Sequence, residues 1–177
     1  MSLVDLVVLG DSLLKANRIR SDQLVVAARD WPGRGSRLAR RAAGFVRNGV
    51  DSPMETRLRM LIVLAGLPEP VVNHILYNAK GGWSKRFDLC YPDLKLVIEY
   101  DGRQHAENDE QWDHDLDRRE SLDNDGWRII VIRSKGLYQE PERTLERVAE
   151  AMRAQGAPNV PKRFREDWRR HFPGRPS

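Results

Sequence analysis

The stretch VIEYDGRQH, residues 97–105, begins like a buried strand and ends in polar residues. After its apolar start it places Glu99 and Asp101 two residues apart, and it reaches His105 after a glycine. Charged side chains are rarely buried unless they are paired or bind a metal ion. Since residues two apart on a strand face the same side, the two carboxylates are expected to point the same way.

Further strands are predicted on both sides of this stretch. Residues 85–91 (KRFDLCY) alternate apolar and polar side chains, and a Pro-Asp turn leads into residues 94–101, which predicts a hairpin. Residues 71–78 and 126–133 are two more candidate strands. Helices are expected over 52–66, 107–124 and 141–156. The pattern predicts a mixed α/β domain whose sheet is covered by helices.

Charge is distributed unevenly along a chain whose formal net charge is +4. Residues 1–50 carry an excess of five positive charges, residues 51–160 an excess of five negative charges, and residues 161–177 an excess of four positive charges. An acidic middle between basic ends is typical of a metal site flanked by phosphate-binding segments. Ordinary solvated surfaces would also explain any single one of these charges.

Three parts of the chain are predicted from composition, helix-capping residues and turn residues. Residues 1–50 form short helices with a basic outer face, residues 51–156 hold the mixed α/β unit, and residues 157–177 form a basic tail. A flexible, disordered end is the alternative for this tail. The single cysteine, Cys90, excludes an internal disulfide and is expected to be a small buried side chain. No run is long enough for a membrane span and the apolar start lacks a basic leader, so a cytoplasmic location is expected.

Asp88 lies across the predicted hairpin from the two carboxylates of the opening stretch. Three carboxylates at one end of a sheet would repel one another, and a hard divalent cation such as Mg²⁺ relieves that repulsion. Each residue also has a simpler explanation: an arginine or lysine partner for Glu99 or Asp101, a capping box with Ser52 for Glu55, and a structural hydrogen bond for His105. None of these explanations accounts for the whole set.

The run from Glu55 to Arg133 resembles the PD-(D/E)XK nuclease superfamily. More closely, it is similar to the proteins related to the very-short-patch-repair endonuclease. The matching pieces are SPMETRLR, RFDLCYP, KLVIEYDGRQH, the segment with QWDHDLDRRESL, and GWRIIVIR. The resemblance implies a restriction-endonuclease-like core, in which a four-stranded mixed sheet is flanked by helices, together with a small helical N-terminal region in this chain.

The resemblance also implies roles for individual residues. Asp88 and Glu99 would bind Mg²⁺ or Mn²⁺ together with the backbone carbonyl of Tyr100, and Glu55 would reach the metal through water. Asp101 and His105 match the DG..H signature, and His105 is the candidate for proton transfer. Gln111 and Asp115 would support the site, although Asp115 also has the spacing of an ion pair within a helix.

Basic side chains are expected to bind nucleic-acid phosphates in three places. They are Arg86, Arg118 and Arg119 near the site, Arg37, Arg40 and Arg41 in the N-terminal region, and Lys162, Arg163, Arg165, Arg169 and Arg170 in the tail.

One departure from the superfamily pattern divides the functional hypotheses. The superfamily lysine is expected two residues after Glu99, where this chain has Asp101. In the repair-endonuclease branch this lysine is also missing, and a histidine is thought to replace it. The first hypothesis is therefore a metal-dependent nucleic-acid hydrolase that cleaves phosphodiester bonds, with a DNA endonuclease or nickase favoured. The alternative is an inactive nuclease fold that acts as a nucleic-acid-binding regulator or an antitoxin-like partner.

Overall fold

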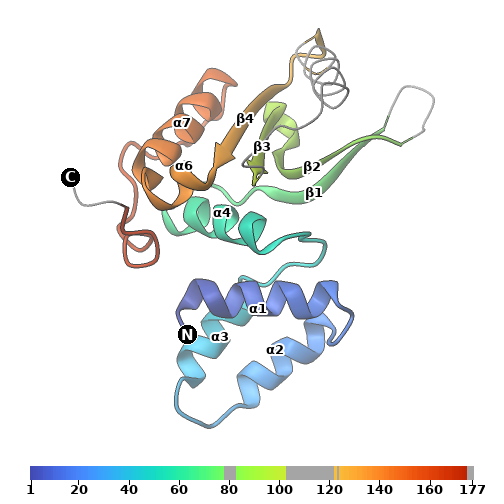
Figure 1. Cartoon of the computed structure of the whole chain (residues 1–177), viewed down its shortest axis with the longest axis vertical. Helices are drawn as coiled ribbons and strands as arrows, with labels where there is room; N and C mark the ends of the chain where they lie inside the picture. Colours follow the sequence, from blue (N-terminus) through green and yellow to red (C-terminus); the bar gives the residue numbers. More distant parts are fainter. Residues whose placement is uncertain (78–82, 103–121, 123, 175–177) are drawn as a thin grey trace.

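The protein is described here by a computed structural model, which describes residues 1–77, 83–102, 122 and 124–174 (Figure 1). Its N-terminal helices are α1 (Leu3–Lys15), α2 (Ser21–Asp30) and α3 (Ser36–Ala43). Helix α4 (Pro53–Leu64) leads into strands β1 (Val71–Tyr77), β2 (Trp83–Tyr91) and β3 (Leu96–Asp101). Strand β4 (Arg128–Arg133) and helices α6 (Ser134–Tyr138) and α7 (Pro141–Ala154) follow.

The four strands form one mixed sheet in the order β1-β2-β3-β4. Strands β1, β2 and β3 are antiparallel neighbours, and β4 runs parallel to β3. A short 3-10 turn, Pro92–Leu94, joins β2 to β3, and Lys95 takes a left-handed conformation at its end. The predicted hairpin and the predicted fold class, a four-stranded mixed sheet flanked by helices, are confirmed.

Apolar side chains cover both faces of this sheet. The larger core joins α1, α4 and α7 to the sheet face that carries Leu89, Ile98 and Ile132. On the opposite face, Val97 and Phe87 pack with Leu122 and Trp127 in a smaller cluster. Burial on both faces explains why β3 begins as a continuous apolar run before its polar end.

Helix α4 lies between the N-terminal helices and the sheet in Figure 1. The Ser52 side chain caps its start by accepting a hydrogen bond from the backbone N–H of Glu55 (3.2 Å), and Pro53 occupies its first position. Gly66, with φ of +85°, follows its end, a conformation that favours glycine. Because α4 packs against neighbours on several sides, most of its residues are buried.

A buried ionic network attaches α1 to α4. The Arg59 side chain, which is 0% exposed, donates to the carboxylates of Asp11 (2.8 Å) and Glu69 (2.9 Å). Asp11 also accepts hydrogen bonds from the Thr56 hydroxyl (2.8 Å) and the Arg47 backbone N–H (2.8 Å). The network therefore spans α1, the segment before α4, α4 itself and the connection to β1.

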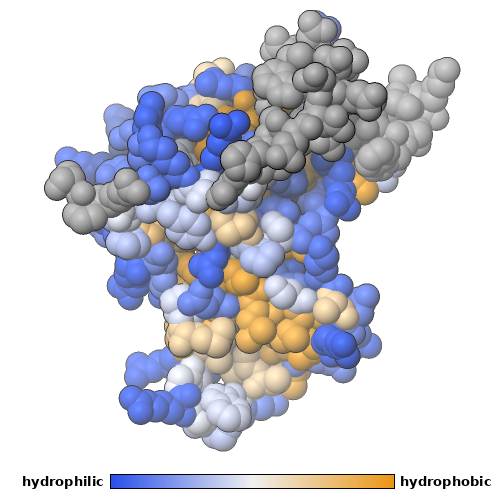
Figure 2. Space-filling model, in the orientation of Figure 1, coloured by the Kyte–Doolittle hydropathy of each residue, from blue (hydrophilic) through white to orange (hydrophobic). Residues whose placement is uncertain are grey.

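The N-terminal helices share the core through α1 and leave α2 at the surface. Leu3, Val4 and Val7 of α1 are buried in the larger core, whereas no residue of α2 is buried. Apolar side chains gather over this end of the molecule in Figure 2. The large exposed apolar residues of this region are Met1, Leu9, Val25, Val26 and Trp31. Among the described helices, none has the length and apolar character needed to cross a bilayer.

The C-terminal segment packs against the core as far as residue 174. Trp168 and Phe172 are 2% and 0% exposed, and the backbone N–H of Arg165 donates to Ala65 (2.9 Å). The alternative of a disordered tail is therefore wrong for residues 157–174, because two aromatic side chains anchor them. The proposed boundaries at residues 50 and 156 stay predictions.

Removal of the Asp11 carboxylate is expected to lower the free energy of unfolding strongly. Asp11→Ala leaves the buried Arg59 guanidinium without one of its two carboxylates, and breaking a buried ion pair costs about 3–5 kcal/mol. Urea unfolding followed by circular dichroism measures the loss. The control is Asp22→Ala, which removes an exposed partner of Arg20 and is expected to change little. Equal losses in both variants would contradict the structural role of the network.

Candidate functional site

Within the described strands, β2 lacks regular backbone pairing at Asp88, both toward β1 and toward β3. In the described part of β1 and β2, Val72 pairs with Leu89 and His74 pairs with Phe87. No backbone pair joins Asn73 to Asp88, which lie between them. In the described residues, the backbone pairing of β2 with β3 extends as far as Leu89 and Ile98, and Asp88 and Glu99 are the next residues in this register. Asn73 has φ of +47°, a left-handed conformation that asparagine tolerates better than most residues.

Side-chain alternation also changes at this position. Phe87 packs in the smaller core cluster and Leu89 in the larger one, although residues two apart on a regular strand share a face. The prediction that Phe87, Leu89 and Tyr91 lie on one face is therefore wrong for Phe87. The change of face coincides with the missing Asn73–Asp88 pair, which lies between the Leu89 and Phe87 pairs.

The Asp88 carboxylate lies at the point where the backbone pairing of β2 with β3 ends, which we call the opening between these strands. It accepts a hydrogen bond from the backbone N–H of Tyr100 at 3.2 Å. Backbone N–H groups point within the plane of a sheet, so this carboxylate points toward β3 and replaces a ladder bond. Glu99 lies opposite by register, and Asp88 and Glu99 are both half-buried. The register therefore places Asp88 opposite Glu99, the two residues that the sequence assigned to metal binding.

Glu55 approaches the same region from the start of α4. The side chain is 7% exposed and accepts a hydrogen bond from the Asp51 backbone N–H (3.0 Å). Burial raises the pKa of this carboxyl, and the negative charges of Asp88 and Asp51 raise that pKa further. The capping explanation is right in part: Ser52 caps the helix, and the Glu55 carboxyl also interacts with the Ser52 side chain as well as with the Asp51 backbone N–H.

The donor set fits a magnesium ion held by few protein ligands. Among the residues that the structure describes, no group of three or more His, Cys, Asp or Glu side chains could hold a metal ion. Mg²⁺ usually binds one or two carboxylates and completes its shell with waters and substrate phosphate. Asp88 and Glu99 provide two carboxylates at the sheet opening. The roles of Glu55 and of the Tyr100 carbonyl as further ligands stay predictions.

Asp101, at the end of β3, pairs with an arginine that the sequence reasoning did not consider. The register of β3 and β4 places Arg133 beside Asp101, and the Arg133 Nε atom lies 3.4 Å from the carboxylate. The Asp101 side chain is 20% exposed. The position that the superfamily gives to lysine therefore holds an ion pair here, with the positive charge supplied by the neighbouring strand.

Several predicted site residues fall outside the described part of the chain. They are His105, Gln111, Asp115, Arg118 and Arg119. The proposed proton transfer by His105 and the supporting roles of the 107–124 segment therefore stay predictions.

Three predicted phosphate-binding cations already have carboxylate partners: Arg41, Arg86 and Arg169. Arg86 forms an ion pair with Asp51, whose backbone N–H binds Glu55. In the tail, Arg169 lies over the Trp168 ring at 4.5 Å and pairs with Glu142 (2.8 Å). These charges are partly compensated within the protein, which reduces their attraction for a phosphate.

The predicted cations of α3 and of the tail are at the surface of the protein. Those of α3 lie away from the sheet opening. Arg41 pairs with Asp167 at 3.1 Å, and α1 and α4 lie between α3 and the sheet in Figure 1. The structure therefore does not place the arginines of α3 next to the carboxylates. The other predicted cations, all exposed, are Arg37, Arg40, Lys162, Arg163, Arg165 and Arg170.

Sequence reasoning missed Asp51 and Arg133. Asp51 directly precedes the cap of α4, and Arg133 ends β4, so their positions next to the boundary of an element were the available signals. Cys90 is buried as predicted, and burial raises the pKa of its thiol to about 12. A thiol with so high a pKa is a poor nucleophile.

Comparison with known proteins points to the nucleases. The model of a restriction endonuclease-like family, REase_MTES_1575, matches residues 82–152, a range that includes Asp88, Glu99 and Asp101. Two curated relatives come from Mycobacterium tuberculosis: MT2308 of strain CDC 1551 / Oshkosh and Rv2248 of strain ATCC 25618 / H37Rv, both described as uncharacterized proteins. Each is 28% identical over 140 residues, which cover 78% of this chain and 51% of the relative.

This chain therefore spans about half the length of the curated relatives that it matches. No solved structure matches it significantly. Similarity to a restriction endonuclease-like family over the segment that carries the carboxylates supports a nuclease-like domain.

Neutralising Glu55 is expected to stabilise the metal-free protein at neutral pH. Since its pKa is raised on folding, the folded state binds this proton more tightly than the unfolded state, and ionisation costs stability as the pH rises above about 4.5. Glu55→Gln keeps an oxygen for the Asp51 N–H. Its melting temperature in EDTA should exceed that of the wild type at pH 7, and this difference should shrink toward pH 4.

The exposed residue Glu146, changed to Gln, is the control and should show no such pH dependence. A Glu55→Gln protein that is less stable than the wild type by the same amount at every pH would show that the carboxylate is structural.

Proposed function

We propose that this protein is a metal-dependent nucleic-acid hydrolase that cleaves phosphodiester bonds, with DNA as the favoured substrate. The observation that carries the proposal is the Asp88 carboxylate in the opening between β2 and β3, opposite Glu99 and bonded to the Tyr100 N–H at 3.2 Å. The match of residues 82–152 to a restriction endonuclease-like family supports the same conclusion. We expect this activity to take place in the cytoplasm.

In this proposal Asp88, Glu99 and the Tyr100 carbonyl hold Mg²⁺ or Mn²⁺, and Glu55 contributes through water. A bound divalent ion would polarise the phosphodiester and lower the pKa of an attacking water. His105 would accept or donate the proton, a role that histidine side chains commonly take in catalysis. The relation to the very-short-patch-repair endonuclease is part of the proposal, because a histidine in place of the missing lysine is the feature they share.

Buried carboxylates explain why the site would need a cation. Burial and the charge of Asp88 raise the pKa of Glu55, so the metal-free protein holds that negative charge at a cost. A divalent cation would compensate this charge. Arg133, which lies 3.4 Å from Asp101, is positioned to supply a positive charge near the superfamily lysine position.

The second candidate is a nucleic-acid-binding protein with the same fold and no hydrolysis, acting as a regulator or an antitoxin-like partner. Two observations favour it. The lysine position holds Asp101 in an ion pair, and the described residues contain no group of three metal-binding side chains.

Cleavage of supercoiled plasmid in Mg²⁺, in Mn²⁺ and in EDTA tests the proposal. Wild-type protein should produce nicked or linear DNA only with metal. Asp88→Asn keeps an oxygen acceptor for the Tyr100 N–H but removes the charge, and it should slow cleavage by about 100-fold or more, since even outer-shell partners of a metal site contribute 10–100-fold. His105→Ala should slow cleavage as well.

The matched control is Asp93→Asn, an exposed carboxylate in the turn between β2 and β3, which should cut like the wild type. Cleavage that persists in EDTA, or an Asp88→Asn protein as active as the wild type, would overturn the proposal. A protein that cuts nothing but binds DNA in a salt-sensitive manner would favour the second candidate.

A further inference from the structure

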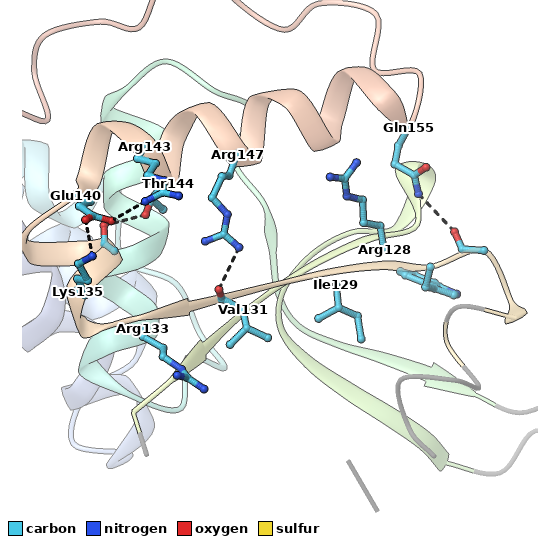
Figure 3. A pocket seen from close by; sticks show the side chains of 13 residues that line it. Arg128, Ile129, Val131, Arg133, Lys135, Glu140, Arg143, Thr144, Arg147 and Gln155 are labelled. Atoms are coloured by element: carbon cyan, nitrogen blue, oxygen red, sulfur yellow. Dashed lines mark hydrogen bonds and ion pairs between the residues drawn. The ribbon is translucent and has the colours of Figure 1, made fainter. Parts of the chain in front are cut away.

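A groove of about 1100 Å³ lies between β4 and α7, outside the carboxylate site (Figure 3). In the sheet order β1-β2-β3-β4, strand β4 is at the edge of the described sheet, so its open side forms the floor of the groove. Residues of α7 form the opposite wall, where Arg143 and Arg147 are four residues apart and therefore share a helix face.

The charged side chains of this groove are mostly positive. Glu140 is the one acidic residue among the described lining residues, and it pairs with Lys135 (2.6 Å) and Arg143 (3.4 Å). Asp101, from the end of β3, also pairs with Arg133, so two carboxylates face five cationic side chains and leave an excess of three positive charges. The cationic residues are Arg128, Arg133, Lys135, Arg143 and Arg147. A concentration of this kind attracts an anionic partner and raises its local concentration.

The edge of β4 is not left open for a peptide strand. The Arg147 Nη2 atom donates to the backbone carbonyl of Val131 at 3.5 Å, and Figure 3 shows this side chain reaching down from α7 onto the strand. At the other end of the groove, the Gln155 amide donates to the carbonyls of Lys95 and Gly126 (3.4 Å each). An added strand would have to displace the Arg147 contact, so a polyanion fits the groove better than an acidic peptide strand.

The groove begins next to the candidate catalytic carboxylates. Arg133 lines it and also contacts Asp101 at 3.4 Å, in the register that pairs the ends of β3 and β4. From there the cationic side chains follow β4 back toward Arg128. Six strand residues span roughly 17–20 Å at about 3.3 Å each, a length along which a nucleic-acid backbone presents several phosphates.

We propose that this groove binds the sugar–phosphate backbone of the nucleic acid beside the phosphodiester that is cut. The inference rests on the proposed function, which it deepens by naming the surface that positions the substrate. Contacts of arginine and lysine with phosphate fix the position of a nucleic acid without reading its sequence. Binding in the groove is therefore insensitive to sequence and decreases with salt.

The test is the salt dependence of binding in EDTA, where cleavage does not interfere. Fluorescence anisotropy with a labelled single-stranded oligonucleotide and with its duplex gives Kd over a range of salt concentrations. The variant Arg143→Gln/Arg147→Gln should weaken binding. Loss of two phosphate contacts should also reduce the slope of log K against log salt by about 1.4 for the single strand or about 1.8 for the duplex.

The matched control is Arg18→Gln/Arg20→Gln, which removes two exposed charges from the N-terminal region and should leave the slope unchanged. A groove variant that keeps the wild-type affinity and slope would overturn the inference. So would a groove variant that loses binding only to a polyglutamate peptide, because the groove would then serve an acidic protein partner.

This outcome is independent of the plasmid assay. If plasmid is cut and the groove variant changes nothing, the groove inference fails and the hydrolase proposal stands. If no plasmid is cut but the salt slope falls as expected, the groove inference stands and the hydrolase proposal fails. Thermal unfolding of both double variants should match that of the wild type, since all four arginines are exposed.

Discussion

The completely buried guanidinium of Arg59 is the constraint on which the arrangement of this molecule depends. A charge with no exposure to water is tolerated only when its partners are in place, and here these partners, Asp11 and Glu69, come from α1 and from the connection between α4 and β1. The network fixes α4 against the N-terminal helices on one side while the sheet packs on the other. The start of α4, which carries Glu55, is thereby held next to Asp88 on β2.

The sheet is irregular at the position of its candidate site residues. At Asp88 the ladder is interrupted toward both neighbours, Asn73 takes a left-handed conformation, and a carboxylate replaces a backbone acceptor for the Tyr100 N–H. Each departure costs some stability, and such departures are typical of functional positions. Burial on both faces of the sheet offsets this cost. The opening also gives Asp88 room to point between the strands rather than into either core.

Much of the fold was predictable because its signals are local. Apolar alternation marked β2 and β3, and Ser52, Pro53 and Gly66 marked the ends of α4. Features that depend on distant residues were not predictable. Arg59 and Asp11 are 48 residues apart, and Trp168 is buried in the core that also contains residues of α1 and α4. The change of face at Phe87 coincides with the missing pair to Asn73 on another strand. Asp88 and Glu99 were found from their own strands, whereas Arg133 required the parallel register of β4.

Binding of a divalent cation by the carboxylates at the opening of the sheet is the central proposal. Calorimetric titration of Mn²⁺ into the metal-free protein tests this claim without depending on a substrate. Mn²⁺ should bind to the wild-type protein and to Asp93→Asn, and this binding should be lost in Asp88→Asn and in Glu99→Gln. Equal Mn²⁺ binding by Asp88→Asn and the wild type, or no binding by the wild type, would contradict the proposal.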